Sequence, residues 1–339
     1  PYWIQNRIQS KETRMRSIIS LSANLRINSW LTVQARGSVD YISDKMRQKF
    51  YASTAPALCG ANGRYIEMDY QETLIYGDVM AMGKRKWEDF TLDVAIGGSI
   101  NDKNVNSTRY DSKNASLKYA NVFNLANIVM NGSASIDQKI DSRRQLQSVF
   151  GTAQVGYQDK VFLDLTARND WASTLAYTSH EKSGFFYPSA GLSFLIDKWI
   201  QLPEWISFAK LRGTYSKVGN DIPQFITNSV SHITAGGELQ ANDAAPFKEM
   251  EPEMTHSVEV GTEWRFFQSR LGFNLTYYRT NTHNQFFKLP ALAGDMYAYR
   301  YVNAGDIQNR GWELTVDATP VLTPDFTWKT SLNFSSNRN

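Results

Sequence analysis

Apolar and polar side chains alternate along about twelve segments of this chain, most of them about 10 to 14 residues long. In the clearest segment, 271–278, Leu271, Phe273 and Leu275 share one face with Tyr277, and the positions between them hold glycine, asparagine, threonine and tyrosine. Because successive residues of a strand point to opposite faces, one face suits lipid and the other suits water. The pattern predicts an all-β fold, an antiparallel transmembrane β-barrel.

Charged side chains fall on the polar face of these segments. The alternation recurs in 161–168, 312–318 and 326–334, and each of these segments places a charge on the polar face. The residues expected to face inward are the carboxylates Asp93, Asp164, Glu259, Glu263, Glu313 and Asp317 and the cations Arg36, Arg168, Arg212 and Lys329. Whether any of these residues form an acid–base pair is left undecided, because separations between strands cannot be read from sequence. A barrel wall that faces water tolerates such charges, and this favours a structural role.

The alternation predicts twelve strands separated by connections of unequal length. The strands are expected near residues 16–28, 30–42, 66–81, 88–100, 145–158, 159–171, 185–196, 207–219, 254–267, 269–289, 298–319 and 326–336. The long connections are 43–65, 101–144, 172–184 and 220–253. Short turns on one side of the membrane and long extracellular loops on the other are typical of outer-membrane barrels.

Three connections carry further predictions. We expect a short helix near Leu117–Phe123, and a helical turn within Asp197–Trp205 whose two tryptophans lie at the inner interface. The segment 220–253 is rich in small, polar and acidic residues, with Pro223, Pro246 and the glycine pair 236–237, so it is expected to be an extracellular excursion. No linker divides the chain, and 1–339 is treated as one domain.

Composition agrees with a membrane wall of strands. The chain holds 17 Tyr, 18 Phe and 9 Trp, and tyrosine and tryptophan suit membrane interfaces because one end of the ring is apolar and the other wet. The mean hydropathy is −0.42 and no apolar run approaches the roughly 18 residues of a spanning helix, so a helical membrane protein is excluded. The same aromatics would also suit the core of a β-sandwich or propeller.

Charge and cysteine content exclude other classes. The 36 basic and 33 acidic residues are nearly balanced and scattered, so no nucleic-acid partner is expected. The single cysteine, Cys59, has no companion for a disulfide or a metal site, and no cofactor is expected. The chain opens on Pro1-Tyr2-Trp3 without a signal peptide, so either a leader was removed or the chain is an internal piece of a longer protein.

The stretch Tyr301–Leu314 carries the most specific family signature. Its residues Asn303, Gly305, Asn309, Gly311 and Glu313 fit the pattern N-x-G-x-x-x-N-x-G-x-E-L. Supporting strings are Arg168–Trp171, Phe186–Phe194, Leu211–Asn220 and Glu251–Thr255. With these motifs the chain resembles the SusC-like (SusC/RagA) branch of TonB-dependent outer-membrane transporters. One departure is Trp171, which stands where family members often carry glycine and serine.

The resemblance implies a transport function in the outer membrane of a Gram-negative bacterium. Family members place a plug domain and a TonB-contacting segment before a barrel of twenty-two strands, so this chain is expected to be a barrel segment. The implied partners are a SusD-like surface lipoprotein, TonB acting through the plug, outer-membrane lipid and an oligosaccharide or oligopeptide ligand, with dimers of transporter–lipoprotein pairs possible. No catalytic residue is implied.

Aromatic residues in the long loops are the candidate ligand contacts. The principal four are Trp171, Tyr177, Tyr119 and Phe225, and further loop aromatics include Tyr65 and Tyr110. They could stack on sugar rings or grip a peptide, or could only pack their own loops.

Two other classes of protein stay open. A self-contained barrel of twelve strands with lipase or protease activity would explain the even strand number, and His256 is the one strand histidine available to it among His180, His232, His256 and His283. A soluble β-sandwich or propeller for carbohydrate binding would require the outward apolar rows to form a core.

Overall fold

The computed structural model describes residues 6–113, 117–130, 134–182, 184–228, 230–233 and 237–339. Twelve strands of these residues form one antiparallel sheet in which each strand pairs with the next strand of the sheet along the chain. A small separate hairpin consists of β9 (His232–Ile233) and β10 (Leu239–Gln240). The strands of the large sheet are β1 (Ile8–Arg26), β2 (Leu31–Phe50), β3 (Arg64–Trp87), β4 (Phe90–Asp111), β5 (Ser135–Tyr157), β6 (Val161–Ala172), β7 (Phe185–Leu195), β8 (Ile206–Asn220), β11 (Glu253–Phe266), β12 (Leu271–Pro290), β13 (Tyr299–Leu322) and β14 (Thr327–Arg338). All twelve predicted strands are confirmed.

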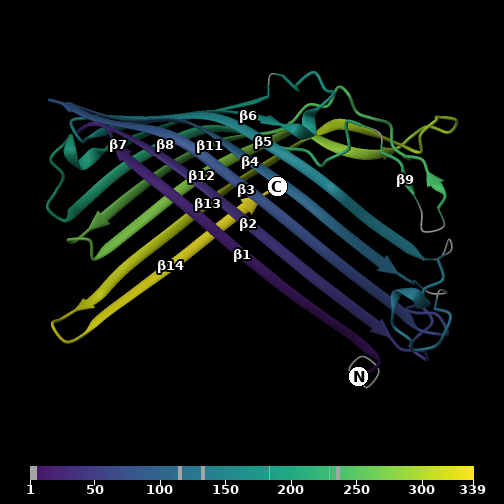
Figure 1. Ribbon diagram of the computed structural model, residues 1–339. Helices are drawn as coiled ribbons and strands as arrows, with labels where there is room; N and C mark the ends of the chain where they lie inside the picture. Colours follow the sequence, from purple (N-terminus) through teal and green to yellow (C-terminus); the bar gives the residue numbers. More distant parts are fainter. Residues whose placement is uncertain (1–5, 114–116, 131–133, 183, 229, 234–236) are drawn as a thin grey trace.

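The sheet curves into a barrel wall with unlike ends. Figure 1 shows the short turns gathered at the left and the longer loops at the right, with front and back strands sloping in opposite directions. Among the described residues, no ladder pairs β1 with β14, so these two strands are the edges of the sheet. No helix of the described residues is long and apolar enough to cross a membrane.

The tight turns have clear local causes. Gln158 and Asp159 both take positive φ, 52° and 53°, and the Lys160 amide donates to the Tyr157 carbonyl at 2.9 Å. A two-residue turn with both central φ values positive matches the right-handed twist of the strands that it joins. This explains the predicted tight connection between β5 and β6.

Outward positions carry the apolar rows that alternation predicted. Across β1, β2 and β3, Ile19 is opposite Val39 and Val39 is opposite Ile75, and all three are exposed. The inward neighbours in the same strands include Arg36 and Asp78, which form an ion pair at 3.0 Å. An apolar face turned to the outside and a charged face turned to the inside fit a wall between lipid and an aqueous interior.

Aromatic side chains surround the short-turn end of the wall. The exposed members are Trp30, Trp87, Phe90, Trp199, Trp205, Phe267, Phe326 and Trp328. The predicted helical turn is η3 (Ile196–Lys198), and the tryptophans beside it stack on strand residues, Trp199 on Phe194 and Trp205 on Phe266. Such a girdle is typical of a membrane interface.

The strands extend further from the membrane than alternation predicted. β2 and β3 reach into the expected loop 43–65, and β4 and β5 reach into 101–144, which leaves connections of 51–63 and 112–134. Beyond the bilayer both faces of a strand meet water, so the apolar rows stop although the backbone ladder continues. Cross-strand ion pairs line these extensions, for example Arg47–Glu67 and Arg143–Asp102.

The helix expected near Leu117–Phe123 is absent from that stretch. Leu117 instead forms an isolated bridge with Ile128, and a short 3-10 turn, η1 (Leu125–Asn127), follows. The Asn127 side chain donates to the Tyr119 and Val122 carbonyls at 2.8 and 2.7 Å. These hydrogen bonds hold the backbone in a compact loop and replace those of a helix.

Candidate functional site at the mouth of the wall

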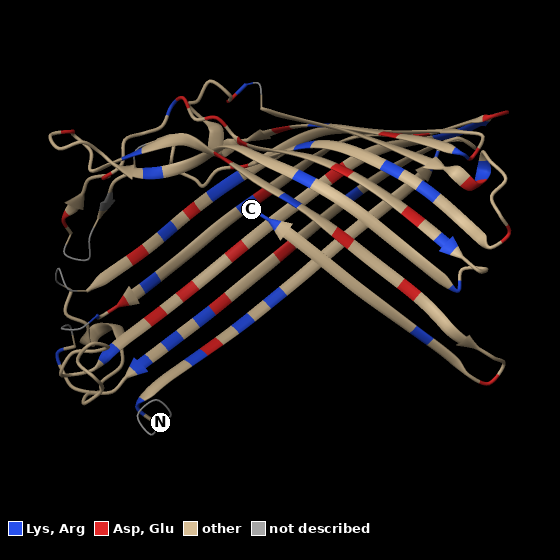
Figure 2. Cartoon of the chain, turned by 180° about the vertical axis from the view of Figure 1, so that it is seen from behind, with Lys and Arg blue, Asp and Glu red and all other residues tan. Residues whose placement is uncertain are grey.

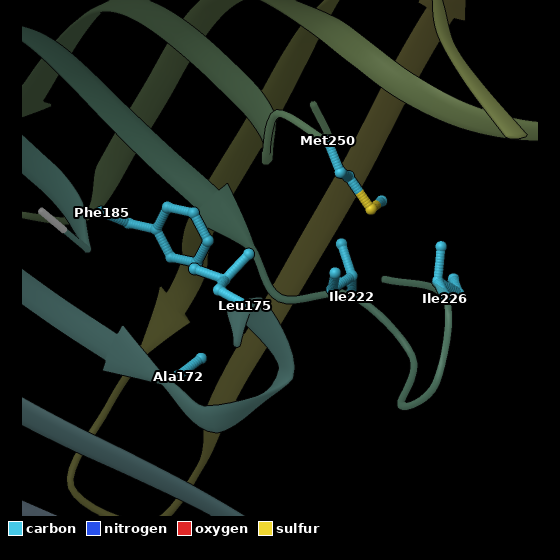
Figure 3. Packing of buried hydrophobic residues seen from close by; sticks show 6 residues of the cluster. All are labelled: Ala172, Leu175, Phe185, Ile222, Ile226 and Met250. Atoms are coloured by element: carbon cyan, nitrogen blue, oxygen red, sulfur yellow. The ribbon is translucent and has the colours of Figure 1, made fainter. Parts of the chain in front are cut away.

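A buried apolar cluster closes the long-loop end of the wall on its inward side. This mouth cluster consists of Ala172, Leu175, Phe185, Ile222, Ile226 and Met250, and Figure 3 shows these side chains. Leu146, Tyr187, Phe286 and Tyr301, from strands on both sides, pack against it. The connection between β8 and β11, which its composition predicted to be an extracellular excursion, therefore folds inward over the mouth.

Asp221 joins three elements beneath the mouth cluster. Its carboxylate accepts from the Arg144 guanidinium of β5 and from the Thr174 hydroxyl of η2 (Ser173–Leu175). It also accepts from the Ile222 amide at 2.7 Å. Sequence analysis missed Asp221, because its partners lie 77 and 47 positions away in the chain.

The far part of the same connection is held by β12 and β13. The Ala245 amide donates to the Tyr299 carbonyl at 2.9 Å, and the Tyr299 amide donates to the Asp243 carbonyl at 3.0 Å. The Glu251 carboxylate accepts from the Asn284 side chain at 2.6 Å. Segments 221–227 and 243–251 are thus anchored to different strands, and the Phe247 amide joins them to each other by donating to the Ile226 carbonyl at 3.1 Å.

A second cluster lies on the outside of the wall. This outer ledge consists of Tyr65, Leu117, Ile128 and Ala134, with Tyr110 and Phe123 packed against it. Tyr65 of β3 belongs to the same outward face as Ile75, because both are odd-numbered residues of one strand. Burial, and then its hydrogen bond to Glu67, raises the pKa of Tyr65 to about 12, so its phenol stays protonated at neutral pH.

An ion pair supports the ledge from the inward side. Arg64 and Asp111 form a two-pronged contact with both N···O distances at 2.8 Å, and Arg64 also donates to the Leu58 carbonyl at 3.2 Å. Burial alone would raise the pKa of Asp111, but hydrogen bonds from Arg64 and the Lys113 amide outweigh it and hold that pKa below its usual range. Cys59, next to Leu58, is buried.

The four predicted ligand contacts do not form one site. Tyr177 and Phe225 are 69% and 59% exposed and take positive φ of 69° and 67°, and they lie in the two loops that the Thr227 hydroxyl joins by donating to the Ala176 carbonyl at 3.0 Å. Trp171 lies on the outward face of β6, opposite Gln147, and its Nε1 donates to the Lys182 carbonyl at 3.0 Å.

Tyr119 is exposed and belongs to the connection that builds the outer ledge. Of the four, Tyr177 and Phe225 are therefore the pair that borders the mouth. The role of each in ligand binding remains a prediction.

The residues of the family motif occupy structural positions in β13. The Asn303 side chain donates to the Glu251 and Asn284 carbonyls at 2.9 and 2.7 Å and accepts from the Glu251 amide at 2.8 Å. Gly305 takes φ of 89° opposite Asn284, whose φ is 59°. Asn303 therefore links two strands to the loop over the mouth.

The other motif residues continue along the same strand. The Asn309 carbonyl accepts from the Thr280 hydroxyl at 3.4 Å, and Gly311 is buried under Tyr278. Glu313 is exposed and lies opposite Thr276 of the inward row.

Among the described residues, no two of the ten charges predicted to face inward pair with each other, and each contact found is with another neighbour. Asp164 accepts from Gln154 at 2.6 Å, Arg168 pairs with Asp170 at 2.7 Å, and Arg212 donates to Thr276 at 2.8 Å. The described residues contain no group of three or more His, Cys, Asp or Glu able to hold a metal.

His256 has neighbours that do not suit a hydrolase. Its Nδ1 shares a hydrogen bond of 2.9 Å with the Tyr215 hydroxyl, and its ring lies 5.6 Å from that of His283. His256 has the same strand parity as the exposed Val258 and Val260, so it belongs to the outward face. A Ser–His–acid arrangement is not assembled around it within the described residues.

Comparison with known proteins identifies the family to which the chain belongs. The wall, its girdle and its covered mouth are those of an outer-membrane β-barrel receptor. A family model described as TonB dependent receptor-like, beta-barrel matches residues 1–338, and the chain belongs to this family. It is accordingly a protein of the outer membrane of a Gram-negative bacterium, and its family consists of receptors and transporters and not of enzymes.

Curated relatives match part of the chain. TonB-dependent receptor P26 of Formosa agariphila is 29% identical over 205 residues, 58% of this chain and 20% of that protein. TonB-dependent receptor SusC of Bacteroides thetaiotaomicron is 24% identical over 213 residues, 58% of this chain and 21% of SusC. The chain thus spans about a fifth of the length of these relatives.

Solved structures share the fold. The RagAB peptide transporter superposes with a TM-score of 0.83 at 19% identity, over 99% of this chain and 37% of that one. The siderophore receptor PiuA from Acinetobacter baumannii has a TM-score of 0.59 at 12% identity, over 96% of this chain and 47% of its own. The resemblance to the SusC/RagA branch is confirmed.

Proposed function

We propose that this chain forms part of the barrel of an active importer of oligomeric nutrients, energised through TonB and working with a SusD-like surface lipoprotein. The observation that carries the proposal is the family match over 1–338 together with the fold shared with the RagAB peptide transporter. The coverage of 37% of that chain supports the view that 1–339 is a barrel segment, with a plug and further strands supplied by the rest of the protein.

The inner wall suits a polar ligand and a plug that moves. Arg16–Asp40, Arg36–Asp78 and Lys103–Glu72 pair across neighbouring strands, so most of the charge on this part of the wall is already neutralised. A neutralised polar wall holds water and hydrogen-bonds a passing ligand without trapping it by a strong field. Pulling by TonB would then act on the plug and leave the wall unchanged.

The mouth supplies the contacts for the ligand. Tyr177 and Phe225 are large, exposed and held on loops that the mouth cluster and Asp221 anchor, which gives a rigid support for stacking on a sugar ring or a peptide side chain. Ligand class, oligosaccharide or oligopeptide, is left open by this geometry. Paired transporters and lipoproteins would form dimers on this proposal.

Uptake by intact cells tests the function. A strain that lacks the protein should lose uptake of one labelled pool, either oligosaccharides or oligopeptides, and complementation should restore it. A protonophore or loss of TonB should abolish the same uptake. Unchanged uptake of both pools in the deletion strain would refute the proposal, and uptake that survives loss of TonB would refute its energy source. A native mass of roughly 100 kDa, scaled from 38.6 kDa by the 37% coverage, would support the barrel-segment view.

A further inference from the structure

Several basic residues lie in β1 and β2 near the N label in Figure 2, and four of them have the strand parity of the outward face. This outer basic patch consists of Lys11, Lys45, Arg47 and Lys49. Lys11 is directly opposite Arg47, and Lys45 is its diagonal neighbour on the same face. Diagonal neighbours lie about 7 to 8 Å apart, within reach of two long side chains that converge on one anion.

The patch lies at the height of the lipid headgroups. The apolar outward row of β1 ends at Met15, and Lys11 follows four positions further out. In β2 the row ends at Tyr41, and Lys45 follows at the same spacing. Four residues of a strand tilted by about 40° rise roughly 10 Å, which is the thickness of the interfacial zone next to the hydrocarbon core.

Two of the four cations in the patch have partners within the protein, and the other two are left to bind an external anion. Arg47 pairs with Glu67 at 3.0 Å, and Lys49 lies over the Phe123 ring, 5.8 Å from its centroid. Among the described residues, Lys11 and Lys45 form no ion pair, although Asp69 is opposite Lys45 in the register. The patch therefore has a surplus of positive charge, carried by two exposed lysines.

We propose that the outer basic patch binds a phosphate group of lipopolysaccharide in the outer leaflet. Lysine ammonium groups pair with phosphate as point charges, and clusters of them beside a bilayer bind anionic lipid. The apolar row directly below the patch, with Met15, Ile19 and Val39 exposed, accommodates the acyl chains of the same lipid. Adjacent sites for phosphate and acyl chains favour a lipid over a soluble phosphate.

Lipid binding to the full-length protein in detergent tests this inference. The probes are lipid A with its phosphates, dephosphorylated lipid A and inorganic phosphate, and binding is measured by native mass spectrometry and by titration. The double variant K11Q/K45Q is compared with K210Q/K329Q, which removes two charges from the inward face instead. Both variants leave the mouth residues unchanged.

We expect wild type and K210Q/K329Q to bind phosphorylated lipid A equally, and K11Q/K45Q to bind it about tenfold or more weakly. Dephosphorylated lipid A should bind wild type about as weakly as phosphorylated lipid A binds K11Q/K45Q. Equal binding of phosphorylated lipid A by K11Q/K45Q and wild type would overturn the proposal. So would equal affinity for the two lipids, or full competition by inorganic phosphate at the concentration of the lipid.

Discussion

Gly311 of β13 lies beneath the ring of Tyr278 of β12, and a Cβ atom at Gly311 would lie 2.6 Å from the Tyr278 hydroxyl oxygen. The two residues are opposite each other in the register and lie on the inward face. The same Cβ atom would lie even closer to the Ser336 carbonyl oxygen of β14, so position 311 requires glycine because a side chain there would collide with this backbone and with the tyrosine. The glycine at position 311 of the family motif is thus explained by packing.

Gly311→Ala should destabilise the barrel by about 1 to 3 kcal/mol, the usual cost of overpacking. The measurement is thermal unfolding of the purified protein in detergent, followed by the shift of the folded band in electrophoresis. Gly272→Ala in β12 is the matched control, because its Cβ would meet no atom closer than 3.6 Å. Equal unfolding temperatures of the two variants would show that position 311 can hold a methyl group without cost.

Asp221→Asn should release the connection between β8 and β11 from the mouth. The variant loses the charge-assisted hydrogen bond to Arg144, an interaction of about 1.5 to 3 kcal/mol when it involves a charged group. Hydrogen exchange of amides in 222–228 should accelerate about tenfold or more. Asp243→Asn, at an exposed pair with Lys288, is the control and should leave these amides protected.

The outer ledge should open in acid. Because the pKa of Asp111 is held below its usual range, its stabilising charge is fully present above about pH 4 and is lost as the pH falls through the lowered value. The opening is measured by hydroxyl-radical footprinting of the buried Cys59 side chain. This reaction does not require the deprotonated thiol, so it can be used in acid. We expect wild type to protect Cys59 at pH 7 and pH 5 and to expose it once the pH falls below the lowered pKa of Asp111, and Asp111→Asn to expose it already at pH 7. Full protection in the variant would contradict the role of this pair.

Replacement of mouth aromatics should separate binding from folding. Tyr177→Ala and Phe225→Ala should each weaken ligand uptake several-fold with normal amounts of protein in the outer membrane, because both side chains are exposed. Trp171→Ala, on the outward face, should leave ligand affinity unchanged. Transport assays at several ligand concentrations check both, and a defect confined to Trp171→Ala would reverse the assignment.

The sequence predicts the strands of the wall better than it predicts the contacts at the mouth. Leu271, Phe273 and Leu275 reveal their strand because each obeys a local rule of two-residue alternation. The contact of Asp221 with Arg144 joins residues far apart in the chain, and no local pattern encodes it. The strand extensions beyond the bilayer were missed because polar residues on both faces remove the alternation while backbone pairing persists.

The topology of the wall is tested most directly by labelling cells with a bulky maleimide that cannot cross the outer membrane. Gln240→Cys lies in β10 (Leu239–Gln240), within the long connection between β8 and β11, and Asp325→Cys lies in the turn between β13 and β14. The account predicts that intact cells label Gln240→Cys and that Asp325→Cys reacts only after the outer membrane is permeabilised. Labelling of both sites, or of Asp325→Cys alone, in intact cells would contradict a barrel wall that spans the membrane in this orientation.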